Sequence, residues 1–381
     1  MNESDPNPCQ KTNNSSPGFD FLGSDLIESI LSRLPIASIL RAASVCKLWN
    51  STIHSSSLEK LVSDSGSFPS WLFLLGQNNH PLLAFDPESN CWIRFSKETC
   101  FSSDSFVASS GFIFSLSLEK FSFRPVFCGR LCQTRPLRFP RRKPLIHVYL
   151  EPDFSKQVRF IVVGGISLLN QEDCLAVEIY SPDENYWELC QPLNEIFHPG
   201  NSAQSLCSAL FKGKFFVYDK YSCFISSFDL IKRSWSNPKT LRPPGTLLSS
   251  LISIRDRLVL AGLCSTYNGG LEFIIWNIDD RTLEFSEIAI MPRDLLSFMI
   301  DRESGQMFSS LKCAGSGRYV YVFNEEFSGD FPVCVWEMSD SGNGSWRRIP
   351  GFPDSVNTNF QNAVSFCFDV SLQYILHGQE S

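Results

Sequence analysis

Apolar residues in the first sixty positions recur every three or four residues, the spacing of one face of an α-helix. In residues 24–50, "SDLIESILSRLPIASILRAASVCKLWN", Pro35 interrupts the pattern, because proline lacks the backbone N–H that a helix interior needs. Further amphipathic runs begin at Ser38 and at Ser44. The pattern predicts three short helices. They carry more apolar side chains than so small a unit can bury, so we expect part of this surface to pack against something else.

From residue 68 onward the pattern changes, and an aromatic residue, six further residues and a tryptophan recur. Complete copies are "FDPESNCW", "YSPDENYW" and "FDLIKRSW", which end at Trp92, Trp187 and Trp235. A degraded copy, "WNIDDRTL", runs from Trp276 to Leu283, and a stretched copy ends at Trp346. Positions 187, 235 and 283 are each 48 apart, whereas 92 and 187 are 95 apart. The long interval predicts a hidden unit near Phe127 and Thr134.

A period of about 40–50 residues is typical of β-propeller blades. Tight turns at Asp86-Pro87, Lys212-Gly213 and Arg255-Asp256 separate apolar runs of strand length, as blade hairpins require. We expect six blades, with seven as the alternative. The first unit lacks its innermost strand, and residues 362–370 are expected to supply it and so close the ring. The fold class is therefore a small all-α unit of three helices followed by an all-β propeller.

Composition restricts the classes of function. The net charge of −7 gives no reason to expect a nucleic-acid-binding protein. Residues 1–19 are polar and are expected to form a disordered tail without the apolar core of a signal peptide. No apolar run approaches the roughly 18 residues that span a bilayer. We therefore expect a soluble intracellular protein of the nucleus or cytoplasm, without a membrane partner, whose 14 cysteines are reduced.

Catalytic motifs are missing from the sequence. The five histidines do not pair at a spacing of three or four, and neither C-x-x-C, G-x-S-x-G nor a phosphate-binding loop occurs. We expect no enzyme activity, no cofactor and no metal site.

Residues 22–53, "LGSDLIESILSRLPIASILRAASVCKLWNSTI", resemble an F-box, the short helical module that binds a Skp-type adaptor. The match includes Glu28, the Leu34-Pro35 pair and a Val-Cys-Lys-x-Trp cluster, and departs from the family at Gly23, where proline is usual. The alternative is an ordinary helical hairpin packed on its own protein. The resemblance implies an F-box over 20–62 and adaptor contacts from Leu22, Leu26, Ile27, Ile30, Leu31, Leu34, Pro35, Val45, Cys46, Lys47 and Trp49.

The double glycine of "FIVVGG" at 160–165 resembles a kelch repeat, which implies a kelch-like propeller over 63–381. The whole chain resembles plant F-box/kelch-repeat proteins. This resemblance implies a non-catalytic substrate-recognition subunit of an SCF-type ubiquitin ligase, linked to a cullin through the adaptor and holding an unidentified target protein on the propeller. The alternatives are a non-degradative protein-interaction scaffold and, more remotely, a kelch-type copper oxidase.

Alternating strand directions place the longer loops of every blade on one face of a propeller, where we expect the target to bind. Large side chains on these loops are the candidate anchors: His198, Tyr221, Arg242, Tyr267 and Phe327. Trp92, Trp187, Trp235 and Trp346 are expected to be blade-core residues.

One segment, residues 120–150, holds eight Lys or Arg residues and no acidic residue. It is interpreted as a solvated loop, with a nuclear import signal in "RFPRRK" or a docking patch for an acidic partner as alternatives.

Overall fold

The computed structural model describes residues 23–64, 69–76, 82–95, 106–117, 119–151, 157–167, 174–198, 205–300, 311–324, 332–352 and 363–380. The chain divides into two compact units, Met1–Ser67 and Phe68–Ser381.

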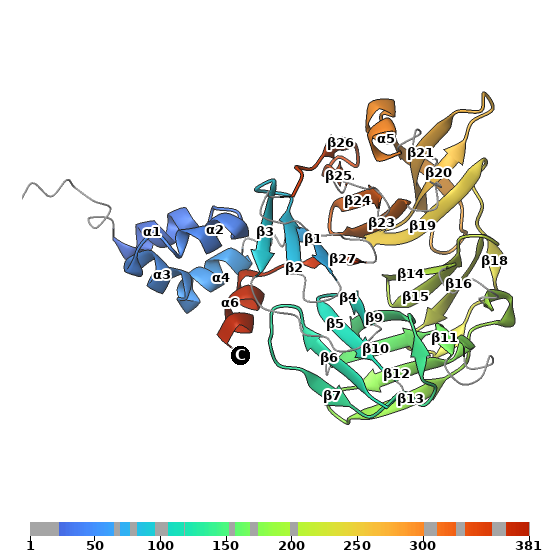
Figure 1. Ribbon diagram of the computed structural model, residues 1–381, viewed down its shortest axis with the longest axis horizontal. Coiled ribbons are helices and arrows are strands. Elements are labelled where there is room, and N and C mark those ends of the chain that lie inside the picture. The colour runs from blue at the N-terminus through green and yellow to red at the C-terminus, as the bar shows by residue number, and fades with distance from the viewer. Residues whose placement is uncertain are drawn as a thin grey trace, which may run out of the picture. The chain divides into compact units, whose positions relative to one another are not determined.

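The first unit contains four helices within its described residues, one more than the periodicity predicted (Figure 1). They are α1 (Ser24–Leu31), α2 (Ile36–Ala42), α3 (Lys47–Ile53) and α4 (Ser56–Asp64). The second and third helices also begin at residues other than those predicted. Pro35 is the N-cap of α2, where its fixed φ suits the residue before a helix, so α2 begins before Ser38. Helix α3 begins at Lys47 rather than Ser44, because the Cys46 thiol accepts a hydrogen bond from the Trp49 amide at 3.4 Å.

Helix α4 was missed because its sequence is mostly polar and buries only Leu58 and Val62. Its start is held to α1 by Glu28, whose carboxylate accepts hydrogen bonds from Ser57 Oγ at 2.7 Å and Ser55 Oγ at 3.3 Å.

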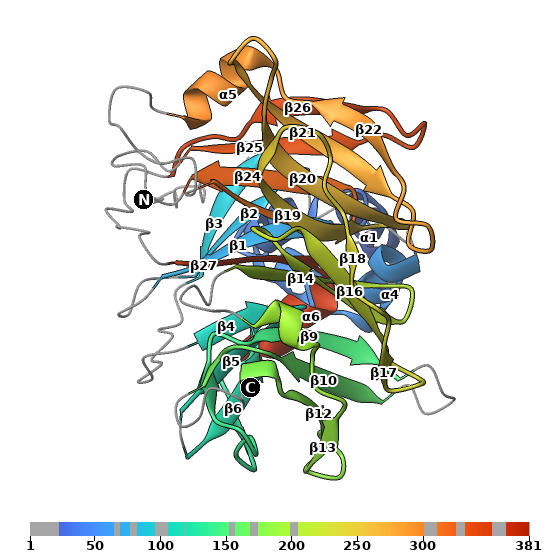
Figure 2. The same ribbon diagram turned by 90° about the vertical axis from the view of Figure 1, so that its right-hand side faces the viewer.

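The second unit is a propeller of six blades, as predicted (Figures 1 and 2). Strands follow from the innermost outward. Blade 1 has β27 (Val364–Asp369), β1 (Ser70–Leu75), β2 (Leu82–Asp86) and β3 (Cys91–Phe95). Blade 2 has β4 (Phe106–Ser109), β5 (Phe112–Leu116), β6 (Phe121–Pro125) and β7 (Cys132–Thr134). Blade 3 has β9 (Leu145–Leu150), β10 (Val158–Val163), β12 (Val177–Ser181) and β13 (Tyr186–Cys190).

Blade 4 has β14 (Leu206–Phe211), β15 (Lys214–Asp219) and β16 (Phe224–Asp229), with both β17 (Ser234–Trp235) and β18 (Lys239–Thr240) paired to β16. Blade 5 has β19 (Thr246–Ile254), β20 (Arg257–Ser265), β21 (Leu271–Ile278) and β22 (Phe285–Ile290). Blade 6 has β23 (Leu311–Ser316), β24 (Tyr319–Asn324), β25 (Val333–Met338) and β26 (Gly344–Arg348). Helix α5 (Arg293–Met299) packs on β21 and β25, and α6 (Leu372–Glu380) follows β27.

Strand β27 joins the two ends of the propeller by pairing with β1 in antiparallel register, Phe73 opposite Phe366. The Phe73 ring stacks on those of Phe366 and Phe368, with centroids 5.2 and 4.6 Å away. Asp369, at the end of β27, accepts hydrogen bonds from Ser70 Oγ and from Ser316 Oγ of blade 6. Pairing with β27 covers the inner edge of β1, whose backbone groups would otherwise be unpaired.

Two of the predicted repeat units are wrong in detail. In blade 2 the strand partner of Thr134 is Phe121 rather than Phe127, because the intervening turn is longer than in the other blades. Phe127 instead packs between blades, 5.8 Å from the Phe73 ring. In blade 5 the turn spans six residues, 279–284, so Trp276 pairs with Glu287, and Leu283 lies in the turn with a φ of 62°.

The double glycine ends β10 and leads into β11 (Ile166–Ser167), which pairs with β8 (Arg141–Arg142) in a two-stranded ribbon. Gly165 has a φ of +111°, and a Cβ there would lie 2.8 Å from the Arg142 carbonyl oxygen. Only glycine allows both that conformation and this close approach of two backbones.

The basic segment is not simply a solvated loop. Arg141 is buried and forms an ion pair with the buried Glu178, with Arg141 Nη2 and Glu178 Oε1 3.1 Å apart. Arg124 is also buried and donates to the Cys128 carbonyl at 2.7 Å. Because Arg141 lies in a buried pair on a strand, "RFPRRK" is not freely accessible as an import signal. The other six basic residues are exposed: Lys120, Arg130, Arg135, Arg138, Arg142 and Lys143.

Candidate functional site

The first unit exposes a set of large apolar side chains on and beside α1 and α3. Leu26 is 53% exposed, Leu34 is 36% exposed and Val45 is 63% exposed, and Ile30 and Leu48 are similar. Side chains of this kind are ordinarily removed from water, and a cluster of them typically marks an interaction surface.

The predicted adaptor-contact residues fall into three groups in the structure. Cys46 and Lys47 are exposed alongside the apolar set, and Pro35 and Trp49 are partly buried. Ile27 and Leu31 are buried, at 1% and 0% exposure, so they support the surface from beneath. Leu22 lies outside the described residues. Leu48 was not among the predicted contacts, although its place in the apolar stripe of the third helix could have identified it.

The departure at Gly23 leaves the start of α1 intact. The Gly23 carbonyl accepts hydrogen bonds from the amides of Leu26 at 3.0 Å and Ile27 at 3.2 Å. Two of the amide groups that every helix start leaves without partners are thereby satisfied by the backbone alone.

The second candidate site lies on the propeller. Strands alternate in direction within a blade, so the tight turns at 212–213 and 230–233 of blade 4 share one face. The loops between second and third strands, such as 220–223 and 266–270, lie on the opposite face, together with the connections between blades. We call this the long-loop face.

Two tyrosines on the long-loop face are exposed on loops that local hydrogen bonds hold in place. Tyr221 is 65% exposed, and its amide donates to Asp219 Oδ1 at 3.0 Å while Ser222 Oγ donates to the other carboxylate oxygen at 2.8 Å. Tyr267 is fully exposed in a turn where the Thr266 hydroxyl accepts from the Gly270 amide at 3.0 Å. These local bonds lower the entropy that the loops would lose on binding a partner.

The other candidate anchors lie in the connections between blades or outside the described residues. His198 and Arg242 are exposed in the connections that leave blades 3 and 4. The exposed apolar residues Ile196 and Leu247 lie on the same face, in blade connections or at a strand start. Phe327 lies outside the described residues.

The four tryptophans lie on outer strands, and three make the same contact with the preceding blade. Their indole N–H groups donate to backbone carbonyls just after that blade's outermost strand: Trp92 to Pro350 at 2.8 Å, Trp187 to Arg135 at 2.9 Å and Trp235 to Gln191 at 3.0 Å. Trp346 packs against the core between blades 5 and 6, but its buried Nε1 has no hydrogen-bond partner among the described residues. The repeating tryptophan is therefore a link between neighbouring blades.

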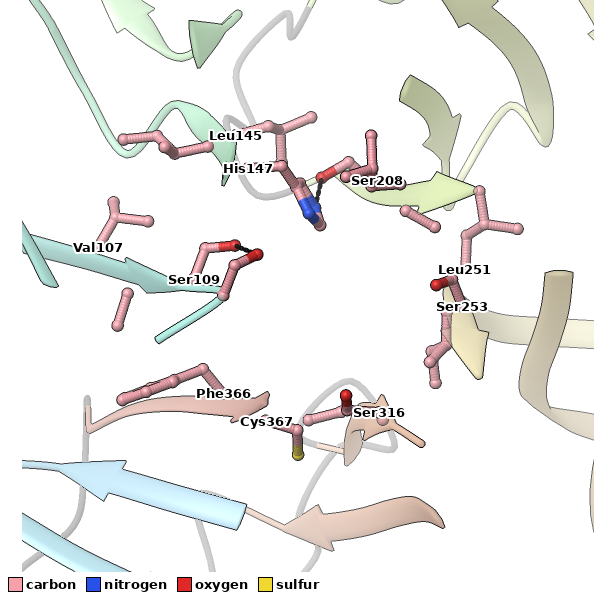
Figure 3. A pocket seen from close by; sticks show the side chains of 18 of the residues that line it. Val107, Ser109, Leu145, His147, Ser208, Leu251, Ser253, Ser316, Phe366 and Cys367 are labelled. Carbon is pink, nitrogen blue, oxygen red and sulfur yellow. Dashed lines mark hydrogen bonds between the residues drawn. The ribbon is translucent and has the colours of Figure 1, made fainter. Parts of the chain in front are cut away.

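A cavity of about 420 Å³ lies among the six innermost strands and was not predicted (Figure 3). No short sequence motif marks it, because its lining comes three or four residues at a time from segments far apart in the chain. On one side of it, His147 of β9 and Ser208 of the neighbouring β14 are hydrogen-bonded, with Nε2 and Oγ 3.1 Å apart. Removal from water lowers the pKa of His147 to about 4, so the imidazole is neutral at pH 7.

The reactive groups to consider among the described residues are possible metal ligands and cysteine thiols. No group of three or more His, Cys, Asp or Glu side chains there is arranged to hold a metal ion. Burial raises the pKa of the Cys190, Cys313 and Cys334 thiols to about 12, so they remain protonated and poorly nucleophilic at neutral pH. Among the described helices, none is long and apolar enough to cross a membrane.

Comparison with known proteins identifies an F-box domain at residues 19–61. An F-box/kelch-repeat protein of Arabidopsis thaliana is 26% identical over 90% of this chain and 93% of its own length. A second F-box/kelch-repeat protein of that plant is 42% identical, over 23% of this chain and 22% of its own. F-box only protein 13 of Arabidopsis is 21% identical over 89% of this chain and 69% of its own. The predicted resemblance to plant F-box/kelch-repeat proteins is confirmed.

Proposed function

We propose that this protein is the substrate-recognition subunit of an SCF-type ubiquitin ligase. In this role the F-box binds a Skp-type adaptor, the adaptor connects it to a cullin, and the propeller holds a target protein. The observation that carries the proposal is the exposed apolar surface of Leu26, Ile30, Leu34 and Val45 on a unit that matches the F-box domain. An F-box acts by binding an adaptor, and these side chains are available for it.

The chain would contribute binding and positioning rather than bond chemistry. Holding a target beside a charged ubiquitin-conjugating enzyme raises the effective concentration of the target's lysines, which accelerates transfer without a catalytic group on the recognition subunit. The described residues fit this role, since they offer exposed loops and a rigid scaffold.

The adaptor contact is tested by the double variant Leu26→Ala, Leu34→Ala. Burying a whole leucine stabilises by about 1.5–3 kcal/mol. With 53% and 36% of the two side chains still exposed, their burial in the complex contributes about 1.3–2.7 kcal/mol, so affinity should fall about 10- to 100-fold. The matched control is Leu131→Ala, Leu189→Ala, two propeller leucines that are 44% and 45% exposed. Unchanged co-purification of adaptor and cullin with the first variant would contradict the proposal.

The target contact is tested separately with Tyr221→Ala, Tyr267→Ala on the long-loop face. Aromatic residues contribute disproportionately to binding at interfaces, so this variant should lose captured targets under proteasome inhibition while still recovering the adaptor. Ile231→Ala, at a 71% exposed position on the tight-turn face, is the control. Loss of targets in the control alone would place the target on the other face. Recovery of targets without adaptor or cullin would favour the non-degradative scaffold, and copper detected by elemental analysis would favour the oxidase.

A further inference from the structure

The cavity at the centre of the propeller has a lining that is polar but uncharged. All six innermost strands contribute to it, and each contacts its neighbours around the ring. Every one of these strands supplies a hydroxyl or an imidazole, and Asp, Glu, Lys and Arg are absent from the lining. The polar side chains are Ser109 of β4 and Ser110 in the turn after it, His147 of β9, Ser208 of β14, Ser253 of β19, Ser316 of β23 and Ser365 of β27.

The polar groups alternate with apolar surface. Val107, Leu145, Leu251 and Phe366 lie between them around the same cavity (Figure 3). Small-molecule sites usually combine a few convergent polar groups with apolar walls. The cavity volume of about 420 Å³ lies within the usual range of such sites, roughly 300–1,000 Å³. The volume is far above the 10–15 Å³ or so that one water molecule needs.

The charge state of the lining restricts the class of ligand. An ion bound against this lining would lose part of its hydration without an opposite charge to replace it, because the lining holds no Asp, Glu, Lys or Arg. His147 is neutral at pH 7, and the thiol of Cys313, which also lines the cavity, is protonated. Hydroxyl groups, in contrast, both donate and accept hydrogen bonds, and so match a partner of the same kind.

We propose that the central cavity is a binding site for an uncharged small molecule that carries several hydroxyl groups and an apolar ring. Its hydroxyls pair with the ring of serines and with His147, and its apolar part packs on Phe366 and Leu145. The ligand would bridge several blades at once, since each inner strand belongs to a different blade. This site is separate from both surfaces of the proposed ligase role.

The test uses the full-length protein and three neutral probes, arbutin, catechol and myo-inositol. The glucuronide counterpart of arbutin, 4-hydroxyphenyl glucuronide, has nearly the same size but carries a carboxylate. Saturable binding is measured by calorimetry and by saturation-transfer NMR at millimolar probe concentration. We expect arbutin to bind and to raise the melting temperature, and the glucuronide to bind at least ten times more weakly. Failure of all three neutral probes to bind, or equal binding of the glucuronide, would overturn the proposal.

Two variants locate the site. Ser253→Phe places a ring in the cavity and should abolish binding, whereas Ser286→Phe, on the exposed face of the outer strand β22, should not. Ser208→Ala removes one hydroxyl without adding volume and should weaken binding about 2- to 12-fold, the effect of one hydrogen bond. If Ser253→Phe does not fold, as judged by circular dichroism, Ser208→Ala decides the outcome. Unchanged affinity in Ser208→Ala, or binding retained by folded Ser253→Phe, would refute the location, and adaptor recovery from the same samples reports the ligase role independently.

Discussion

The hydrogen bond from the tryptophan indole to the preceding blade predicts that two similar substitutions will differ in how much they destabilise the propeller. Trp92 is 8% exposed, its indole N–H donates to the Pro350 carbonyl at 2.8 Å, and its ring lies 4.8 Å from that of Phe352. Trp92→Phe keeps an aromatic ring but removes the donor. Trp346→Phe makes the same change where Nε1 is buried without a partner among the described residues.

The magnitudes follow from what each substitution removes. Both lose part of an aromatic ring in a packed environment, a cost common to the pair. Trp92→Phe also loses a hydrogen bond, which contributes about 0.5–1.5 kcal/mol. Trp346→Phe instead removes a buried donor that lacks a partner, and such a group is itself destabilising by about 1–3 kcal/mol. Trp92→Phe should therefore be the more destabilising of the two by at least about 0.5 kcal/mol.

The assay is urea unfolding of the full chain, followed by far-UV circular dichroism. The midpoint and the slope m give the free energy of unfolding, and an unchanged m shows that the same surface is exposed in each variant. Equal midpoints for the two variants, or a lower midpoint for Trp346→Phe, would refute the inter-blade role of the indole N–H.

Three further predictions concern buried charge, ring closure and pH. Glu178→Gln should destabilise the propeller by about 3–5 kcal/mol in urea unfolding, because it leaves Arg141 charged and buried, while Arg141→Met with Glu178→Leu should cost much less. Asp369→Ala should cost about 1–2 kcal/mol and expose the junction to early amide exchange, since Ser70 and Ser316 lose their shared acceptor; unaltered exchange in β27 would contradict this. His147 has a lowered pKa, so the unfolded chain binds its proton first, and stability should fall as pH drops from about 6.5 to about 4, by at most about 3 kcal/mol. His147→Phe should flatten that part of the pH profile relative to wild type, and an identical slope would show that other groups cause it.

The features that the sequence predicted correctly depend on residues close together in the chain. The aromatic and tryptophan of each complete repeat, such as Phe85 and Trp92, face each other across a single hairpin. Their spacing of seven is set by one tight turn, so it appears directly in the sequence. The helical periodicity of α1 and the role of Pro35 are local for the same reason, since a helix repeats within four residues.

The predictions failed where local spacing does not determine the partner. A longer turn moved the true partner of Thr134 from Phe127 to Phe121, and the six-residue turn of blade 5 likewise places Trp276 opposite Glu287. Helix α4 was missed because its segment is mostly polar, although Leu58, Leu61 and Val62 follow helical spacing and Glu28 stabilises its start from 27 residues away.

Tertiary structure alone decided where charge and empty space lie. Arg141 looked like part of a solvated basic run until the fold placed Glu178 at 3.1 Å from it, in a different strand and out of water. The central cavity was beyond prediction for a stronger reason. Its serines and His147 are spread over six strands between residues 109 and 365, and only closure of the ring brings them to one axis. A chain can specify each strand through nearby residues, but the space that the strands enclose depends on how all six pack at once.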